Sequence, residues 1–288
     1  MAKILVTGAN GQLGMELRDL AVVNPQHSFH FATRAELDIT NKVSVDKFFH
    51  QFLPDYCINC AAYTAVDKAQ TDEVAASAIN VLGVKNLAAA SFIRHTKLIH
   101  ISTDYVFDGG ATIPYKEDDA TNPIGVYGTT KWEGEQVAIQ ENPTTVIIRT
   151  SWVYSVYGNN FVKTMLRLME SRTEVNVVAD QYGSPTYAAD LAASIFYIIE
   201  SSIWEPGIFH FSNEGSISWF DFATAIKEAT QSRCIINPIT TDQFPTQAKR
   251  PKYSVMDKSK IIKIYGLPIY NWKGSLNKCL SLFQNISK

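Results

Sequence analysis

Three glycines directly after the first apolar segment constrain the fold of this chain more than any other feature of its sequence. Lys3–Thr7 has the composition of a buried strand, and it runs into a G-x-x-G-x-x-G segment at residues 8–14, after which leucines recur at helical spacing. Glycine lets the backbone turn tightly and approach a phosphate without an intervening Cβ atom. The following helix directs its N–H groups and dipole at the same anion. This order predicts a dinucleotide-binding unit rather than an ordinary loop.

The rest of the first 150 residues alternates apolar runs with helical patterns. Further strands are expected at residues 29–32, 57–60, 98–102 and 146–149. Helices are expected at residues 43–52, 74–93 and 127–139. Continuous apolar runs are typical of a parallel sheet that is covered on both faces. With right-handed crossovers, residues 1–150 are therefore expected to form an α/β fold, a Rossmann-type doubly wound parallel sheet that binds NADP(H).

From about residue 151 the pattern becomes less regular. Short strands are expected at residues 175–178 and 208–211, and helices at 161–169, 189–200 and 219–230. Five of the eleven prolines lie between Pro206 and Pro268. We therefore expect residues 151–288 to form a smaller, mixed α/β C-terminal domain; the family resemblance given below implies that this domain binds the substrate. As an alternative, the helix at 160–170 or the helix around Ile195 folds back onto the sheet.

The charge and the hydropathy of the chain indicate which classes of molecule it does not bind as its main partner. Lys and Arg total 26 and Asp and Glu total 28, which gives a net charge of −2, and 46% of the residues are hydrophobic. This balance favours neither a nucleic acid nor a membrane surface as partner. No apolar run approaches the roughly 18–20 residues that cross a bilayer, and the N-terminus lacks the pattern of a signal peptide. We therefore expect a cytoplasmic protein.

Cys57 and Cys60 form a C-x-x-C spacing close to a βαβ pattern, an arrangement also found in redox motifs. Here the spacing falls in an expected strand, where three residues span roughly 10 Å and point to opposite faces. That separation exceeds the reach of a disulfide. No second pair of cysteines completes a zinc site. Packing is therefore favoured over redox chemistry.

The end of the second expected strand indicates which nicotinamide cofactor the chain prefers. NAD enzymes usually place an acid there to hold the ribose 2′-hydroxyl, whereas this chain places Thr33 and Arg34. A guanidinium can bind a 2′-phosphate, so Arg34 favours NADPH. A shifted register would bring Glu36 or Asp38 to that position and favour NADH.

Further cofactor contacts are expected after the second and third strands. Asp38 and Ile39 are expected beside the adenine, with a helix cap as the alternative role of Asp38. Residues 61–63 are expected to line the cofactor. Together the predicted cofactor-binding residues are Gly8, Gly11, Gln12, Leu13, Gly14, Arg34, Asp38, Ile39, Ala61, Ala62, Tyr63, Tyr127 and Lys131.

Tyr127 and Lys131 lie four residues apart in an expected helix, so they share one helix face. The ordinary pKa of tyrosine, about 10, is too high for easy proton exchange at neutral pH. We expect the ammonium of Lys131 and the positive charge of an oxidised nicotinamide to lower the pKa of Tyr127. The fourth strand ends near Thr103, whose hydroxyl would lie in the crevice where ligands bind. Tyr127, Lys131 and Thr103 are therefore the predicted catalytic residues for hydride transfer to a carbonyl.

With these features the sequence resembles the extended short-chain dehydrogenase/reductase superfamily and, within it, the dTDP-4-dehydrorhamnose reductase family. The likeness covers nearly the whole chain. Its segments are residues 60–69, 102–107, 126–131, 149–154, 159–161 and 180–186, and Arg250-Pro251 followed by Asp257.

The resemblance implies a reaction and a role for each residue. NADPH would reduce the C4 keto group of a dTDP-4-keto-6-deoxy sugar, dTDP-4-dehydro-L-rhamnose, in nucleotide-sugar biosynthesis for cell-surface polysaccharide. Tyr127 would protonate the forming alkoxide, Lys131 would hold the nicotinamide ribose, and Thr103 would bind the C4 oxygen. Asp104, Tyr105 and Trp152 would be further substrate-binding residues. The residues alone favour a core position for Trp152.

The resemblance also concerns metal and assembly, because some members form homodimers bridged by Mg²⁺ through glutamates. Glu16 matches one such position, but residues 187–190 supply no complete set of ligands. We therefore predict no metal site, with Mg²⁺ as an open alternative and a homodimer as the expected assembly. The alternative for Glu16 is a solvated carboxylate in the first helical turn, where the helix dipole favours negative charge.

Two other functions remain as alternatives. A nucleotide-sugar epimerase or dehydratase of the same superfamily would retain bound NAD, and a dehydratase needs an acid/base pair where this chain has one candidate acid, Asp104. A non-catalytic regulatory subunit of the same fold would not need Tyr127, Lys131 and Thr103 together. The complete set favours the reductase.

Overall fold

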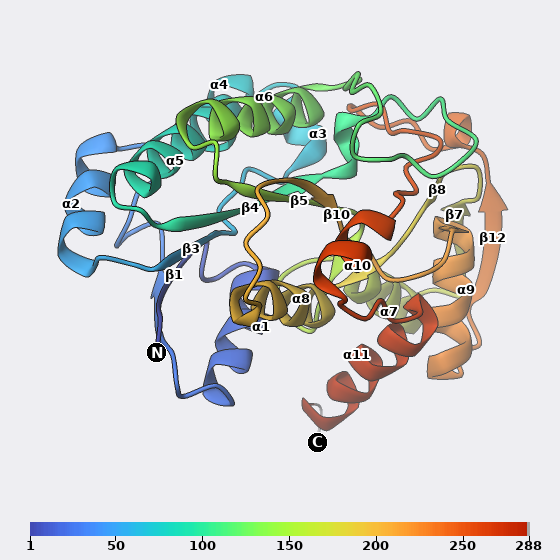
Figure 1. The fold of residues 1–288 in the computed structure, drawn as a ribbon. Helices are drawn as coiled ribbons and strands as arrows, with labels where there is room; N and C mark the ends of the chain where they lie inside the picture. The colour runs from blue at the N-terminus through green and yellow to red at the C-terminus, as the bar shows by residue number, and fades with distance from the viewer. Residues whose placement is uncertain (287–288) are drawn as a thin grey trace.

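A six-stranded sheet forms the centre of the computed structural model, which describes residues 1–286 (Figure 1). Neighbouring strands are parallel throughout, in the order β10-β5-β4-β3-β1-β2. The strands are β1 (Lys3–Thr7), β2 (Ser28–Ala32), β3 (Tyr56–Asn59), β4 (Lys97–Thr103), β5 (Val146–Thr150) and β10 (Gly207–His210). The predicted doubly wound parallel sheet is confirmed.

The strand order reverses between β1 and β3, and this position sets the place of the site. The chain runs outward from β1 to β2, then crosses to β3 and continues to β4 and β5. The last residues of β1 and β3, Thr7 and Asn59, are register partners, and the Thr7 hydroxyl donates a hydrogen bond to Asn59 Oδ1 at 2.7 Å. The loops after these strands therefore lie side by side at a topological switch point, where α/β sheets bind ligands.

Alternate residues of the strands build a core on each face of the sheet, because successive side chains point to opposite faces. Ile4 and Val6 belong to one core and Leu5 to the other. The first core is covered by α1 (Gln12–Val22), α8 (Ala188–Glu200) and α10 (Ser259–Tyr265). The second is covered by α2 (Lys42–Phe52), α5 (Val84–Ile93) and α6 (Val126–Glu141). Both faces of the sheet are thus buried, as the continuous apolar runs predicted.

A third core lies beside the sheet and is built by later parts of the chain (Figure 1). Its helices are α7 (Phe161–Ser171), α9 (Trp219–Thr230) and α11 (Trp272–Ile286). Three pairs of short strands accompany them: β7 (Glu174–Val178) with β12 (Ile235–Ile239), β8 (Tyr182–Gly183) with β11 (Ile217–Ser218), and β6 (Val153–Tyr154) with β9 (Thr186–Tyr187). The first and third pairs are parallel and the second is antiparallel. This part of the molecule is mixed α/β.

Segments beyond residue 150 also contribute to the central sheet. β10 pairs with β5 at its edge, and Ile195 of α8 lies in the core beneath α1. The helix around Ile195 thus takes the folded-back position, whereas α7 contributes to the third core. A domain boundary at residue 150 stays a prediction, and the chain crosses between the two parts more than once.

One helical stretch passes the length and composition test for a membrane span. It comprises α4 (Glu73–Ser77), a π-helical segment (Ala78–Gly83) and α5, and half of its most apolar window is buried inside the fold. The prediction that no apolar stretch approaches spanning length is therefore wrong by this criterion. The burial is that of a core helix, since Leu87 and Ala88 are part of the core beneath α5.

Cys57 and Cys60 are both free thiols, one inside β3 and one just after it. Burial raises the pKa of both thiols well above its ordinary value. High thiol pKa values disfavour the reactive thiolate. These positions agree with the packing interpretation of the C-x-x-C spacing.

Candidate active site

The glycine-rich loop is shaped by close backbone contacts. Gly8 has φ of 65°, and a Cβ atom there would lie 2.6 Å from the backbone nitrogen of Ala61. A Cβ atom on Gly14 would lie 2.6 Å from the carbonyl oxygen of Gly8, whereas one on Gly11 would meet the same oxygen at 3.2 Å. Gly8 and Gly14 are therefore required by the fold of the loop itself, Gly8 by conformation and space, Gly14 by space.

Helix α1 begins directly at this loop. Gly11 occupies its N-cap position, and no side-chain hydrogen bond of the described chain caps the helix there. The first N–H groups of a helix have no partner inside the helix, and together with the dipole they attract anions. The loop and the helix start therefore fit the pyrophosphate of a dinucleotide.

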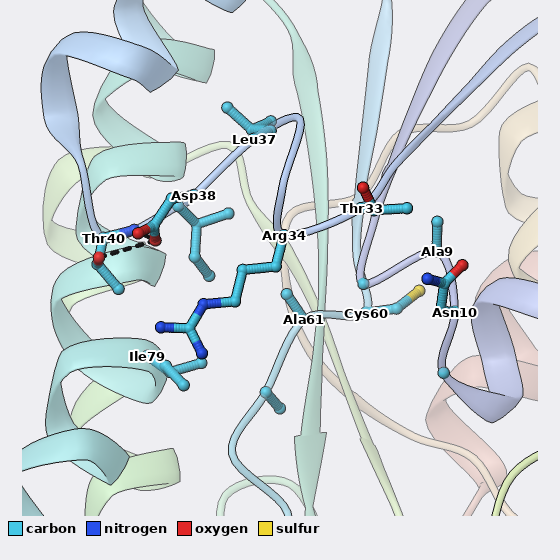
Figure 2. Close-up of a pocket in the computed structure, with 14 residues that line it drawn as sticks. Ala9, Asn10, Thr33, Arg34, Leu37, Asp38, Thr40, Cys60, Ala61 and Ile79 are labelled. Carbon is cyan, nitrogen blue, oxygen red and sulfur yellow. Dashed lines mark hydrogen bonds between the residues drawn. The ribbon is translucent and has the colours of Figure 1, made fainter.

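A cavity of about 340 Å³ opens over the ends of β1, β2 and β3 (Figure 2). Seven predicted cofactor residues line it: Gly8, Gly11, Arg34, Asp38, Ile39, Ala61 and Ala62. Seven lining residues were not predicted as contacts: Ala9, Asn10, Thr33, Leu37, Thr40, Cys60 and Ile79. Asn10 was discoverable from its place inside the glycine-rich loop. Ile79 was not, because only the tertiary fold brings the π-helical segment to this cavity.

Arg34 extends from the end of β2 across the cavity toward Ile79 (Figure 2). Glu36 turns back instead, and its Oε2 accepts hydrogen bonds at 2.8 Å from both the backbone N–H and the hydroxyl of Thr33. These bonds lower the pKa of Glu36. Of the two acids that a shifted register would bring to the ribose, Glu36 is therefore bonded to Thr33, whereas Asp38 lines the cavity together with Arg34.

Asp38 lines the cavity and also forms a local turn. Its Oδ1 accepts hydrogen bonds from the backbone N–H of Thr40 at 3.0 Å and from the Thr40 hydroxyl at 2.8 Å. The hydroxyl bond and the backbone bond lower the pKa of Asp38, with a smaller contribution from Arg34. The helix that follows is capped by Asn41, whose side chain accepts from Ser44. Asp38 is therefore not the N-cap residue of α2.

Tyr127 and Lys131 occupy the first turns of α6, next to the end of β4. Lys131 is almost fully buried, and its Nζ donates a hydrogen bond to the carbonyl oxygen of Ile101 at 2.6 Å. Burial lowers the pKa of Lys131 to about 8, against an opposing effect of Glu135. Lys131 also lies in the electrostatic environment of Cys60, which lines the cavity. Neither Tyr127 nor Lys131 lines the cavity itself, and Cys60 is the lining residue whose thiol pKa responds to Lys131.

The pKa of Tyr127 differs from the prediction. Burial raises it to about 12, and hydrogen bonding with Thr103 opposes this only in part. The expectation that the Tyr127 pKa is lowered is therefore wrong for the protein without a bound nicotinamide. Desolvation of the phenolate is the larger cause of the increase, and the charge of Asp104 adds to it. A tyrosine with a raised pKa stays protonated at neutral pH, as a proton donor must.

Thr103, Asp104 and Tyr105 follow one another at the end of β4 and surround Tyr127. The Thr103 hydroxyl donates to Asp104 Oδ1 at 3.1 Å and accepts from the Tyr105 N–H at 3.2 Å. The Tyr105 ring lies edge-on to that of Tyr127, with centroids 5.5 Å apart. Asp104 is 2% exposed, and burial raises its pKa to about 6. The structure therefore brings the predicted hydroxyl, acid and tyrosines together.

Three predicted cofactor residues point elsewhere. The Gln12 amide donates to the carbonyl oxygen of Val153 at 3.4 Å and accepts from the Asn160 amide at 2.9 Å. Leu13 is buried in the core beneath the sheet. The Tyr63 hydroxyl donates to a carboxylate oxygen of Asp72 at 3.0 Å. These side chains do not line the cavity, so any contact of Gln12 or Leu13 with a phosphate would use the backbone.

Trp152 lies at the edge of the third core. Its ring stacks on that of Trp219 with centroids 3.5 Å apart, and it fills the space where a Cβ atom on Gly183 would be 2.6 Å from the indole. Its φ is 48°, a conformation that costs a residue with a large side chain about 1–3 kcal/mol. The surrounding fold therefore holds Trp152 in a strained backbone conformation, and the residue is half-buried.

Glu16 does not take the solvated position that was its alternative role. It is 6% exposed, so it is not a solvated carboxylate. Its Oε1 accepts a hydrogen bond from the Ser155 hydroxyl at 2.5 Å, and burial raises its pKa. Within residues 1–286 no group of three or more His, Cys, Asp or Glu side chains is arranged to hold a metal ion. A Mg²⁺ ion that bridges two copies of the chain stays an open alternative.

Comparisons with known proteins agree on one family. A family model described as the RmlD substrate binding domain matches residues 2–285. The dTDP-4-dehydrorhamnose reductase of Aggregatibacter actinomycetemcomitans is 43% identical over 286 residues, which cover 96% of this chain and 97% of the relative. A solved dTDP-4-dehydrorhamnose reductase from Clostridium acetobutylicum has a TM-score of 0.94 at 43% identity, covering 98% of this chain and 99% of that one. A solved dTDP-4-dehydrorhamnose reductase from Bacillus anthracis, in complex with NADP, has a TM-score of 0.93 at 41% identity, covering 97% and 99%.

Proposed function

The chain belongs to the RmlD substrate-binding-domain family, and on that basis we propose that it is an NADPH-dependent dTDP-4-dehydrorhamnose reductase. It reduces the C4 keto group of dTDP-4-dehydro-L-rhamnose and forms dTDP-L-rhamnose. The observation that carries this proposal is the meeting of Tyr127, Lys131 and Thr103 at the end of β4, in a sheet whose β1, β2 and β3 ends form a cavity that fits a dinucleotide.

Each residue of the site has a separate role in the carbonyl reduction. NADPH, when bound, supplies the hydride. Tyr127, kept protonated by its raised pKa, donates its phenolic proton to the oxygen that becomes the C4 hydroxyl. Thr103 orients that oxygen by turning its hydroxyl from Asp104 toward the substrate. Lys131, held against the end of β4, hydrogen-bonds the nicotinamide ribose and stabilises the phenolate that the proton transfer leaves.

The preference for NADPH over NADH rests on Arg34. Its guanidinium points into the cavity, Glu36 is bonded to Thr33, and Asp38, which also lines the cavity, is bonded to Thr40. A guanidinium binds a 2′-phosphate through strong charge-assisted hydrogen bonds. A relative that is 41% identical was solved with NADP. Both observations support NADPH, with NADH as the weaker cofactor.

The sugar side of the site is proposed to use Asp104, Tyr105 and Trp152. Asp104 and Tyr105 adjoin Thr103 directly, and Trp152 is half-buried and held in a strained conformation. Strained backbone conformations often accompany functional positions. A dTDP-linked 4-keto-6-deoxy sugar is the proposed substrate, in keeping with the names of the relatives. A cytoplasmic location and a homodimer stay predictions.

The decisive experiment supplies purified protein with NADPH and a panel of 4-keto-6-deoxy nucleotide sugars, and follows the loss of NADPH absorbance. We expect turnover with dTDP-4-dehydro-L-rhamnose and release of dTDP-L-rhamnose. Protein that carries stoichiometric NAD and returns the hydride to the same sugar would instead be an epimerase or dehydratase. A folded protein that binds NADPH but turns over no member of the panel would favour the regulatory subunit.

A further inference from the structure

A fully buried carboxylate lies one helical turn beyond Lys131. Glu135 of α6 has no exposed surface, and its oxygens accept hydrogen bonds from Arg149 Nε at 2.9 Å and from an Arg149 Nη at 2.7 Å. The hydroxyl of Ser102 donates a third hydrogen bond to it. Burying two charges is costly, and it is tolerated only with close pairing and additional hydrogen bonds of this kind.

The three residues of this network join the elements that carry the catalytic groups. Ser102 directly precedes Thr103 at the end of β4, and Arg149 of β5 is its register partner. Glu135 shares its helix face with Lys131, four residues earlier. The network therefore fastens α6 to the ends of two strands at the level of the site.

Arg149 is buried and carries a permanent positive charge. Among the described residues, Glu135 is its one carboxylate partner. Its guanidinium carbon lies 5.1 Å from the centroid of the Phe107 ring. Next to it, His210 has a pKa lowered to about 3 by burial, with a further contribution from Arg149, so it stays neutral. Without Glu135, the charge of Arg149 would stand unbalanced in the protein interior, close to the helix that carries Lys131.

We propose that Glu135 is a positioning residue for the reduction proposed above: its carboxylate cancels the charge of Arg149 and holds Lys131 as an ammonium at the end of β4. This inference rests on the proposed function only for the role of Lys131. The buried Glu135–Arg149 ion pair thus controls the charge of Lys131, in addition to its contribution to packing.

The charged and titratable groups around Lys131 support this assignment. Burial lowers the pKa of Lys131 to about 8, and Glu135 and Cys60 are the groups that raise it. The Cys60 thiol is neutral because burial raises its own pKa, and His100 of β4 is neutral because burial and Lys131 lower its pKa. Tyr127 is protonated and has its own partner in Thr103. The carboxyl of Asp104, next to Thr103, further raises the pKa of Tyr127. Glu135 therefore supplies the negative charge that keeps Lys131 protonated.

The test follows the pH dependence of NADPH binding, measured by fluorescence titration between pH 6.5 and 10 without any sugar. In the native protein we expect the affinity to fall as Lys131 loses its proton, with a midpoint near pH 8. Glu135→Gln should move the midpoint toward acid by about one pH unit, because Arg149 is then unbalanced. Arg149→Met should move it toward alkali, and the double variant should return it close to the native value.

A control and the contradicting outcomes complete the design. Glu133→Gln alters a neighbouring glutamate of the same helix and should leave the midpoint unchanged. Variants that unfold at lower temperature but keep the native midpoint would show that the network only stabilises the fold. If Glu135→Gln does not fold, Arg149→Met still decides the question, because only control of charge predicts an alkaline shift. Absence of sugar turnover in the native protein would refute the proposed function and leave this binding test intact.

Discussion

At the level of single residues, the protein prepares Tyr127 to give a proton rather than to take one. Its pKa is raised to about 12 by burial, whereas the pKa of its neighbour Lys131 is lowered to about 8 by the same cause. Both shifts favour the neutral forms because a desolvated charge is costly. In the reducing direction a protonated tyrosine is the required starting state.

Replacing Tyr127 by Phe tests this role directly. We expect kcat to fall by at least about 10²-fold, the low end of a general-acid contribution, while the dissociation constant of NADPH stays near its native value. Stopped-flow and steady-state assays would measure both. Tyr197→Phe, at a tyrosine of α8 that is 45% exposed, is the matched control. A kcat near the native value in Tyr127→Phe would remove the residue from the mechanism.

Arg34 provides the second prediction at this scale. In Arg34→Leu we expect the KM for NADPH to rise about 10- to 100-fold, the equivalent of about 1.5–3 kcal/mol for a charged hydrogen bond, and the KM for NADH to change little. The ratio of the two constants is the measurement. Arg172→Leu, at an exposed arginine that does not line the cavity, serves as control. Equal changes for both cofactors would mean that Arg34 does not recognise the 2′-phosphate.

At the level of elements, close backbone approaches hold the site together. Gly134 of α6 faces the π-helical segment, and a Cβ atom on it would lie 2.2 Å from the carbonyl oxygen of Asn80. The Asn80 side chain in turn donates to the carbonyl oxygen of Tyr63 at 3.2 Å and to the Thr130 hydroxyl at 3.1 Å. Glycine at position 134 thus allows the helix that carries the Tyr–Lys pair to approach the helix beside it.

Gly134→Ala should therefore lower the free energy of unfolding by about 1–3 kcal/mol, the usual penalty of overpacking, despite the better helix propensity of alanine. Urea denaturation followed by circular dichroism measures this quantity. Gly274→Ala in α11 is the control, since nothing lies within 4 Å of its added Cβ atom. There we expect a gain of up to about 1 kcal/mol. A gain at both positions would show that α6 can move away without cost.

At the level of the whole molecule, stability should depend on pH through Asp104. Its pKa rises from the ordinary 3.8 to about 6 in the folded protein, where it is 2% exposed. A folded pKa above the unfolded one means that its contribution to stability is complete below about pH 4 and is lost as the pH rises through about 6. The difference between these two pKa values corresponds to at most roughly 3 kcal/mol in the free energy of unfolding.

Asp104→Asn removes this penalty. The variant should therefore be more stable than the native protein by about 2–3 kcal/mol above pH 7, and the difference should vanish toward pH 4. Thermal and urea unfolding across this range would measure it. Asp118→Asn, at an exposed loop position, controls for the loss of one negative charge. A pH-independent difference for Asp104→Asn would contradict the burial of a charged carboxyl at this site.

Contacts between residues far apart in the chain determine where the segments after residue 150 lie. The strand Gly207–His210 and the helix Ala188–Glu200 have ordinary local patterns, yet they complete the central sheet and its core. Gln12 shows the same dependence, since its amide joins the glycine-rich loop to Val153 and Asn160 rather than lining the cavity. Linear order does not reveal such contacts, because they join residues far apart in the chain.

Local sequence pattern is sufficient to predict the strand, loop and helix of the glycine-rich segment, the parallel sheet, and the position of Tyr127 and Lys131 on one helix face. These features follow from local sterics and from the period of apolar residues, which act over a few positions. The folded chain, in contrast, is needed to see the turn of Glu36 onto Thr33, the burial of Glu16, the pairing of Glu135 with Arg149 and the raised pKa of Tyr127. Each of these depends on which distant groups exclude water from a side chain, and desolvation is a property of the folded whole.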